Sequence, residues 1–154
     1  MLSILTFTVK DTLFGFNALQ IKEINDTHDY SVVPGSDQQI RGILNIRGKI
    51  ITIFDLSQIL GWDTTATTST IKNIIFKTEH ETENLDPEYQ IHYTSNDIFG
   101  FMVEKINDIV EIAEESLQPP PANIDKIAKE YIKGVVRLKE GLVTLLKVEN
   151  LIEN

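Results

Sequence analysis

The chain has 154 residues, 42% of them hydrophobic and 24% charged, which is the size and composition of one globular domain. It contains no cysteine, so a disulfide scaffold, a thiolate metal site and a cysteine nucleophile are excluded. The 23 acidic residues against 14 lysines and arginines give a net charge of −9, and the basic residues are scattered. Because such a surface repels phosphate groups, we expect no nucleic-acid partner.

The sequence also indicates where the protein works. Residues 1–6 have neither the basic start nor the small-residue cleavage site of a secretory signal. No apolar run approaches the roughly 20 residues that are needed to span a bilayer. We therefore expect a cytoplasmic, soluble protein without direct membrane insertion.

Short β-type segments separated by turn residues dominate the N-terminal part of the chain. We expect strands over residues 2–9, 13–16, 40–46 and 49–54. In the last of these runs, bulky residues are dense enough to predict burial on both faces. Residues 18–24 fit either a helical turn or a strand, and periodicity does not decide over so few residues. A short helix is expected over residues 55–61, with Asp55 at its start and Gly61 at its end.

The β-type pattern continues after a polar linker over residues 64–70. Further strands are expected over residues 71–77, 98–103, 106–112, 131–138 and 142–147, the last two as a hairpin. Residues 124–130 predict a short helix. Residues 78–97 contain six acids and no lysine or arginine, and we expect an extended acidic loop there, with a brief strand over residues 89–93. About ten short strands and few helices predict an all-β barrel or sandwich.

The histidines and carboxylates form no catalytic or metal-binding pattern. His80 and His92 share the acidic segment, but their spacing is not that of a metal site, and solvated loop side chains are the simpler interpretation. The sequence has no Gly-x-Ser-x-Gly nucleophile motif and no glycine-rich phosphate loop. We therefore expect no enzyme activity, no metal and no cofactor.

The hairpin around Arg47 and Gly48 is unusual. Arg41 and Arg47, two of the three arginines, lie at the edges of this very apolar hairpin. One interpretation is a plain turn in which Gly48 takes a positive φ and Arg47 is merely solvated. The other is an interaction arginine held rigidly beside apolar surface, a role that suits its planar donor fork and weakly hydrated head.

Several segments together form a pattern that is known from one family. Residues 21–24 read Ile-Lys-Glu-Ile, and residues 45–56 read Asn-Ile-Arg-Gly-Lys-Ile-Ile-Thr-Ile-Phe-Asp-Leu. Residues 99–109 begin Phe-Gly-Phe-Met-Val-Glu, and residues 145–151 read Leu-Leu-Lys-Val-Glu-Asn-Leu. In this order, and over nearly the whole chain, they resemble the CheW-domain family of chemotaxis adaptors.

The resemblance implies an all-β fold of two intertwined five-stranded barrels that are similar to SH3 barrels. It implies one domain over residues 1–154, with an acidic loop insertion at about 78–97. It also implies a non-enzymatic adaptor that couples chemoreceptors, the methyl-accepting chemotaxis proteins, to a CheA-type histidine kinase. The implied partners are the signalling tip of the receptor and the regulatory domain of the kinase, within membrane-associated receptor arrays.

Particular residues carry these expectations. Glu23 and Arg47 match family positions linked to receptor binding, and Ile21 is the expected adjoining apolar contact. An ion pair between Glu23 and Arg47 is the alternative under which each residue is partly structural. Gly42 and Gly48 are expected to be structural turn residues, needed for the backbone conformation and not for contacts with a partner.

The chain also departs from the family pattern. Thr52 stands where the family has proline, Glu104 where it has aspartate, and Lys147 where it has an acid. The acidic segment over residues 78–97 replaces a tight hairpin, a change that would tune or redirect partner choice. Two alternatives stay open: an adaptor of a pilus-motility or other chemosensory-type pathway, and a β-barrel that binds a small ligand. The sequence gives no reason to expect a stable homo-oligomer.

Overall fold

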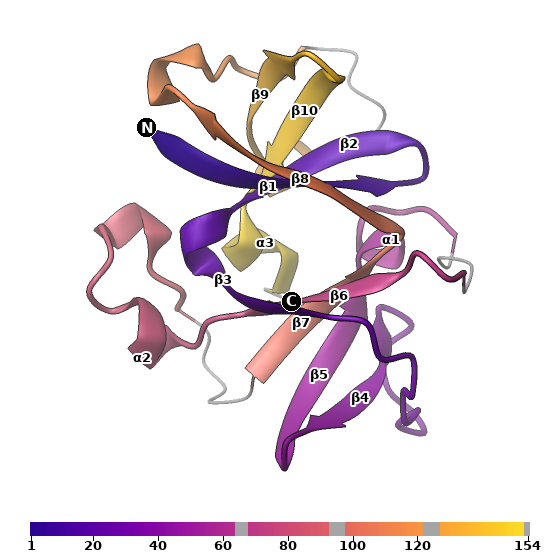
Figure 1. Ribbon diagram of the computed structural model, residues 1–154. Coiled ribbons are helices and arrows are strands. Elements are labelled where there is room, and N and C mark those ends of the chain that lie inside the picture. The colour runs from indigo at the N-terminus through magenta and orange to yellow at the C-terminus, as the bar shows by residue number, and fades with distance from the viewer. Residues whose placement is uncertain (64–67, 93–97, 122–126, 153–154) are drawn as a thin grey trace.

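The computed structural model describes residues 1–63, 68–92, 98–121 and 127–152 of the chain. Within these residues, ten strands form two five-stranded sheets joined by short helical turns, so the expected all-β class is confirmed (Figure 1). Parts of the predicted linker over residues 64–70 and of the predicted helix over residues 124–130 lie outside the described residues, as do residues 93–97 of the acidic segment.

The two sheets are intertwined along the chain. The first has the order β8-β1-β2-β10-β9 and is built from β1 (Leu2–Val9), β2 (Thr12–Asn17), β8 (Lys105–Ile112), β9 (Ile132–Leu138) and β10 (Gly141–Leu146). The second has the order β3-β6-β7-β5-β4 and is built from β3 (Ile21–Asn25), β4 (Ile40–Ile46), β5 (Lys49–Asp55), β6 (Lys72–Phe76) and β7 (Ile98–Val103). The chain leaves the first sheet after β2, completes the second, and returns as β8, as the family resemblance implied.

Residues 18–24 contain both of the structures that the sequence allowed. One turn of 3₁₀ helix, η1 (Ala18–Gln20), is followed directly by β3. Asn17 Oδ1 accepts a hydrogen bond from the Leu19 amide at 2.9 Å and so caps the start of the turn. This turn carries the chain from the first sheet to the second.

The short helix after β5 is confirmed as α1 (Leu56–Ile59). The Asp55 side chain accepts a hydrogen bond from the Ser57 amide at its start, and Gly61 beyond its end has a φ of +88°. Further helical turns in the C-terminal part of the described chain are η3 (Glu114–Ser116), η4 (Lys129–Tyr131) and α3 (Val148–Ile152). Of these, η4 overlaps the end of the predicted helix over residues 124–130.

Phenylalanine side chains join the two sheets into one core. All seven phenylalanines of the chain belong to a single buried cluster that draws on both sheets. Phe16 of β2 is fully buried, and its ring centroid lies 4.9 Å from that of Phe76 and 5.6 Å from that of Phe101, both in the second sheet. Because these aromatic contacts cross between the sheets, neither sheet has a complete core without the other.

The acidic segment is not the extended loop that the sequence predicted. Its described part begins with α2 (Glu79–Thr82), whose first turn is closed by a capping box between Thr78 and Glu81. A second turn, η2 (Pro87–Tyr89), occupies the start of the strand predicted over residues 89–93. Counting charges overlooked the Thr-x-x-Glu capping motif, which is the local signal for a helix start.

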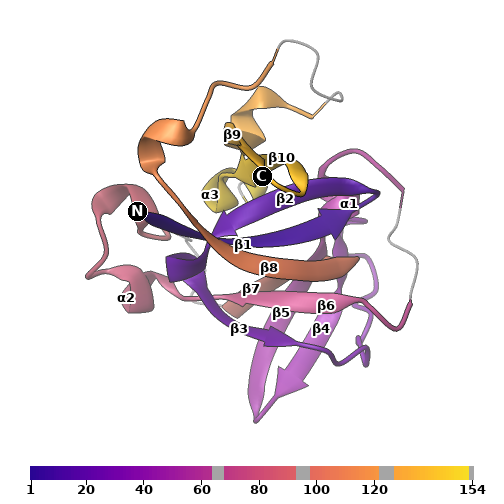
Figure 2. The same ribbon diagram turned by 45° about the horizontal axis from the view of Figure 1, so that its top comes forward.

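Contacts to both sheets hold this acidic segment in place beside β3 (Figure 2). Ile91 is fully buried in the core that joins the sheets, and Tyr89 is buried against residues of the first sheet. Thr82 Oγ1 accepts a hydrogen bond from the Ile91 amide at 2.9 Å. An ion pair of 2.8 Å between Lys22 and Glu81 ties α2 to β3 of the second sheet.

We expect Tyr89 to stay protonated at a pH where ordinary tyrosines ionise. Burial raises the pKa of Tyr89 above its usual value of 10.0, and so does the hydrogen bond that its hydroxyl donates to Glu114 at 2.7 Å. Since the folded-state pKa is the higher one, the stabilisation is complete below pH 10.0 and is lost as the pH rises through the folded value.

An ultraviolet titration of the wild type and of Tyr89→Phe checks this expectation. At about pH 11 the two folded proteins should show equal phenolate absorbance, and the wild type should gain one extra phenolate only on unfolding. One additional phenolate in the folded wild type at that pH would contradict the prediction. In urea near neutral pH, losing the hydroxyl should cost about 1 kcal/mol of unfolding free energy.

Candidate interaction site

The β4–β5 turn places Arg47 in a backbone conformation that arginine disfavours. Ile46 and Lys49 are paired, so the loop consists only of Arg47 and Gly48. Both have a positive φ, +52° at Arg47 and +80° at Gly48, as in a type I′ turn. A residue with a Cβ costs roughly 1–2 kcal/mol in this left-handed region, and asparagine or glycine is the usual choice. Arg47 is therefore kept at this position against local stability.

The Arg47 side chain reaches the strand at the opposite edge of its own sheet. Arg47 Nη2 donates a hydrogen bond to Glu23 Oε2 at 2.6 Å, which forms the ion pair that the sequence left open. Because β3 and β4 are the two edge strands of the second sheet, this contact joins its open ends. The Arg47 side chain remains 72% exposed and that of Glu23 27%. Such an exposed pair contributes at most about 1 kcal/mol, and most of the Arg47 side chain stays accessible.

The other expected site residues have different surroundings. Ile21 is half-buried and packs against the core that joins the sheets. Gly42 lies at a register shift in β4 rather than in a turn, with a φ of +155°, and a Cβ there would lie 2.8 Å from the Ser31 carbonyl oxygen. Gly48 is in the turn, where a Cβ would meet nothing within 4 Å, so its positive φ is what favours glycine.

Two isoleucines close in sequence to Glu23 and Arg47 are exposed. Burial on both faces was expected for β5, and this is wrong at Ile50, which is 56% exposed. Pairing between β5 and β7 begins only at Ile51, so the hairpin tip extends past β7 (Figure 1). Ile24, next to Glu23 on β3, is 43% exposed. Neither residue was among the predicted site residues, because an exposed isoleucine in an apolar run has the same sequence signal as a core residue.

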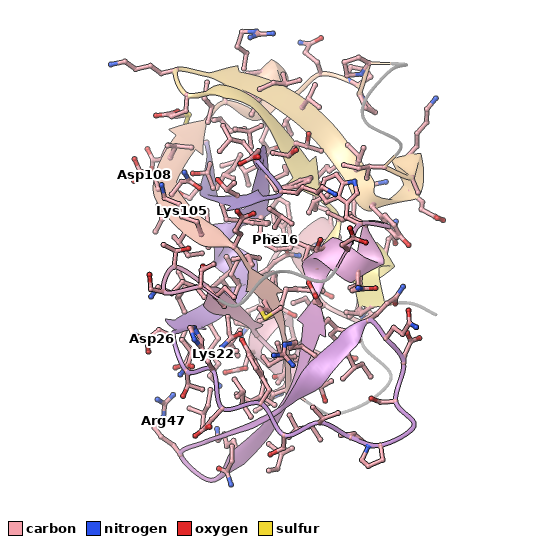
Figure 3. The ribbon with its side chains drawn as sticks, turned by 90° about the vertical axis from the view of Figure 1, so that its right-hand side faces the viewer. Phe16, Lys22, Asp26, Arg47, Lys105 and Asp108 are labelled. Atoms are coloured by element: carbon pink, nitrogen blue, oxygen red, sulfur yellow. The ribbon has the colours of Figure 1, made fainter. Side chains whose placement is uncertain are left out.

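Charged side chains of both signs surround this region. Figure 3 shows Arg47, Lys22 and Asp26 along one side of the molecule, with Lys105 and Asp108 further along the same side. Lys22 is in β3, Asp26 follows that strand, and Arg47 is in the β4–β5 turn. Lys105 and Asp108 belong to β8. Since β3 and β8 are both edge strands, this side presents one edge of each sheet.

Three residues that depart from the family pattern differ in their surroundings. The longer side chain of Glu104 reaches the β1–β2 turn, where its Oε2 accepts a hydrogen bond from the Lys10 amide at 2.6 Å. Thr52 is a half-buried residue of β5, and Lys147 is exposed at the junction of β10 and α3.

Metal-type ligands do not gather in the described residues. No group of three or more histidine or carboxylate side chains lies close enough there to hold an ion. His80 is 86% exposed, and its Nδ1 lies 3.3 Å from a carboxylate oxygen of Glu83. Within the same described ranges, no helix has the length and apolar character that crossing a membrane requires.

Residues 3–154 match the sequence model of the CheW-like domain. The chain belongs to the CheW-like domain family. This confirms the resemblance that the sequence segments indicated.

The relatives described next match nearly the whole chain at 22–26% identity. The chemotaxis protein CheW of Treponema pallidum is 26% identical over 152 residues, which cover 96% of this chain and 80% of that protein. The chemotaxis protein CheW of Thermotoga maritima is 25% identical over 150 residues, which cover 97% and 87%. The crystal structure of the scaffolding protein TtCheW from Thermoanaerobacter tengcongensis has a TM-score of 0.80 at 22% identity, over 99% of this chain and 88% of that one, and so shows the same fold.

Proposed function

We propose that this CheW-family protein is a non-enzymatic adaptor that couples chemoreceptors to a CheA-type histidine kinase. Membership of the family and the names of its chemotaxis relatives support this function. One observation carries the choice of site: Arg47 is highly exposed and is kept in a left-handed turn conformation. Lys10 and Asp11 of the β1–β2 turn also have a positive φ, but of these three residues only Arg47 matches a family position linked to receptor binding.

In this proposal, the recognition surface lies on the second sheet, where Arg47 of the β4–β5 turn meets Glu23 of β3. Arg47 presents a planar fork of donors, of which one is engaged by Glu23, to a carboxylate or carbonyl group of the receptor tip. The exposed isoleucines of the same sheet, Ile24 of β3 and Ile50 of β5, are the candidate apolar contacts. A charged anchor next to apolar side chains is the usual composition of an energetic hot spot in an interface.

The adaptor couples receptor to kinase if it binds their conformational states with different affinities. An adaptor that holds receptor and kinase together links their conformational equilibria only when its contacts are stronger in one state than in the other. The core that both sheets share supports the proposal that the chain acts as a single domain over residues 1–154. A shift of the receptor tip at the Arg47 surface is thereby passed to the kinase regulatory domain without deformation of the adaptor. The protein performs this role in receptor arrays at the membrane.

A charge swap separates binding from structure at this site. We expect Glu23→Arg and Arg47→Glu each to weaken co-sedimentation with a receptor signalling-tip fragment by about tenfold or more. The double swap should recover the intramolecular ion pair and near wild-type stability in urea, yet leave receptor binding weak. Arg137→Ala removes an exposed arginine of β9 and serves as the matched control, which should bind as the wild type does. Recovery of receptor binding by the double swap would show that the pair acts only within the adaptor.

A further inference from the structure

A cavity of about 200 Å³ lies away from Arg47 and Glu23, between the acidic segment and the first sheet. Four parts of the chain line it: the end of β2 with η1, the η2 turn, β9, and the junction of β10 with α3. Sites for drug-sized molecules usually measure about 300–1,000 Å³, so this cavity suits a smaller ligand.

The charges of the lining are balanced. Lys133 and Lys147 contribute two positive charges, and Glu88 and Glu149 contribute two negative charges. A simple anion entering the cavity meets the two carboxylates and the net charge of −9 of the whole chain, and a simple cation meets the two lysines. A small molecule that carries both charges matches the lining best.

Lys133 is held in the cavity wall by two contacts. Its Nζ lies 4.7 Å from the centre of the Tyr89 ring, within cation–π range. It also lies 3.4 Å from Glu88 Oε2, which is longer than a well-formed charged hydrogen bond. A ligand carboxylate on Lys133 and a ligand ammonium on Glu88 would replace this loose pair by two shorter ones.

The remaining lining provides an apolar wall and an unpaired donor. Leu145, Leu146 and Val148 are buried and form the apolar part of the cavity. Asn17 also lines it and is only 5% exposed. Its Oδ1 caps η1, and its Nδ2 has no hydrogen-bond partner among the residues that the structure describes. A buried donor without a partner is unfavourable, and a ligand carboxylate is the kind of acceptor that it lacks.

We propose that this cavity binds a small aliphatic α-amino acid. The carboxylate lies at Lys133 on the Asn17 side, the ammonium faces Glu88, and the aliphatic side chain packs on Leu145 and Val148. This inference does not rest on the adaptor function, because the cavity shares no residue with the proposed receptor surface. The acidic segment supplies Glu88 and Tyr89, so the site depends on the part of the chain that departs from the family pattern.

The test is a titration followed by amide chemical shifts in the wild-type chain. L-leucine should cause saturable shifts centred on Gln20, Tyr89 and Leu146, with a Kd on the order of 1 mM, as expected for a ligand of this size. Two analogues each lack one charge: 4-methylpentanoate has no ammonium, and 3-methylbutylamine has no carboxylate. Both should bind about tenfold more weakly or worse.

Two lysine variants complete the test. Lys133→Met removes the positive charge from the wall and should abolish the L-leucine shifts, whereas Lys139→Met, in the exposed β9–β10 turn, should leave them unchanged. Three results would overturn the proposal: no saturable shift of the wild type up to about 50 mM L-leucine, equal binding of an analogue, or wild-type affinity in a folded Lys133→Met. If Lys133→Met fails to fold, the comparison of the three ligands on the wild type decides.

Discussion

Arg47→Asn should leave the protein at least as stable as the wild type and yet remove receptor binding. Asparagine followed by Gly48 is a preferred pair for a type I′ turn, so relief of the left-handed arginine should contribute about 1–2 kcal/mol. Loss of the exposed pair with Glu23 should cost at most about 1 kcal/mol. Urea unfolding gives the stability, and co-sedimentation with a receptor tip fragment gives the binding.

A second substitution in the same turn serves as a control, because its expected effects on stability and on receptor binding are the reverse of those of Arg47→Asn. Gly48→Ala keeps the Arg47 side chain but places a Cβ at a φ of +80°, so it should lower stability by roughly 1–2 kcal/mol and retain binding while the protein is folded. If Arg47→Asn instead bound the receptor normally, Arg47 would be an ordinary solvated turn residue. That outcome would remove the main observation behind the proposed site.

Phe16→Ala should cost about 3–5 kcal/mol of unfolding free energy, a large part of the 5–15 kcal/mol that a domain usually has. The Phe16 ring is fully buried and contacts Phe76 and Phe101 of the other sheet, so its removal leaves a cavity at the junction of the sheets. Phe16→Leu, which fills most of that space, should cost less than about 1.5 kcal/mol.

Two probes of the same unfolding experiment test whether the sheets form one cooperative body. Far-ultraviolet circular dichroism reports all strands, and fluorescence reports the single tryptophan, Trp62, whose ring lies 6.0 Å from that of Phe14. The two transitions should coincide in the wild type and shift together in Phe16→Ala. Separate transitions would show that the sheets unfold independently, and would contradict the rigid coupling in the proposed mechanism.

Local sequence patterns were sufficient for most of the fold. Alternation and turn residues located the strands, and Asp55 and Gly61 marked the limits of α1. They were not sufficient in the acidic segment, where Tyr89 and Ile91 are buried although the surrounding charges indicated a solvated loop. Burial there comes from contacts with both sheets, and such contacts lie far away in the sequence.

The candidate site was only partly visible in the sequence for a related reason. The hairpin motif pointed to Arg47, but its contact with Glu23 depends on the curvature that brings the two edges of the second sheet together. Exposure of Ile50 depends on where pairing with β7 begins, which is a property of register rather than of composition. The left-handed conformation of Arg47 became clear only once the loop was known to have two residues.

The most direct test of the adaptor function measures how much CheA-type kinase sediments with receptor signalling-tip fragments in the presence and absence of this protein. We predict that the kinase enters the pellet only when the wild-type chain is added, and that Arg47→Asn does not replace the wild type. If the kinase stays in the supernatant with the folded wild-type chain present, the chain does not join receptor to kinase, and the proposed function is wrong.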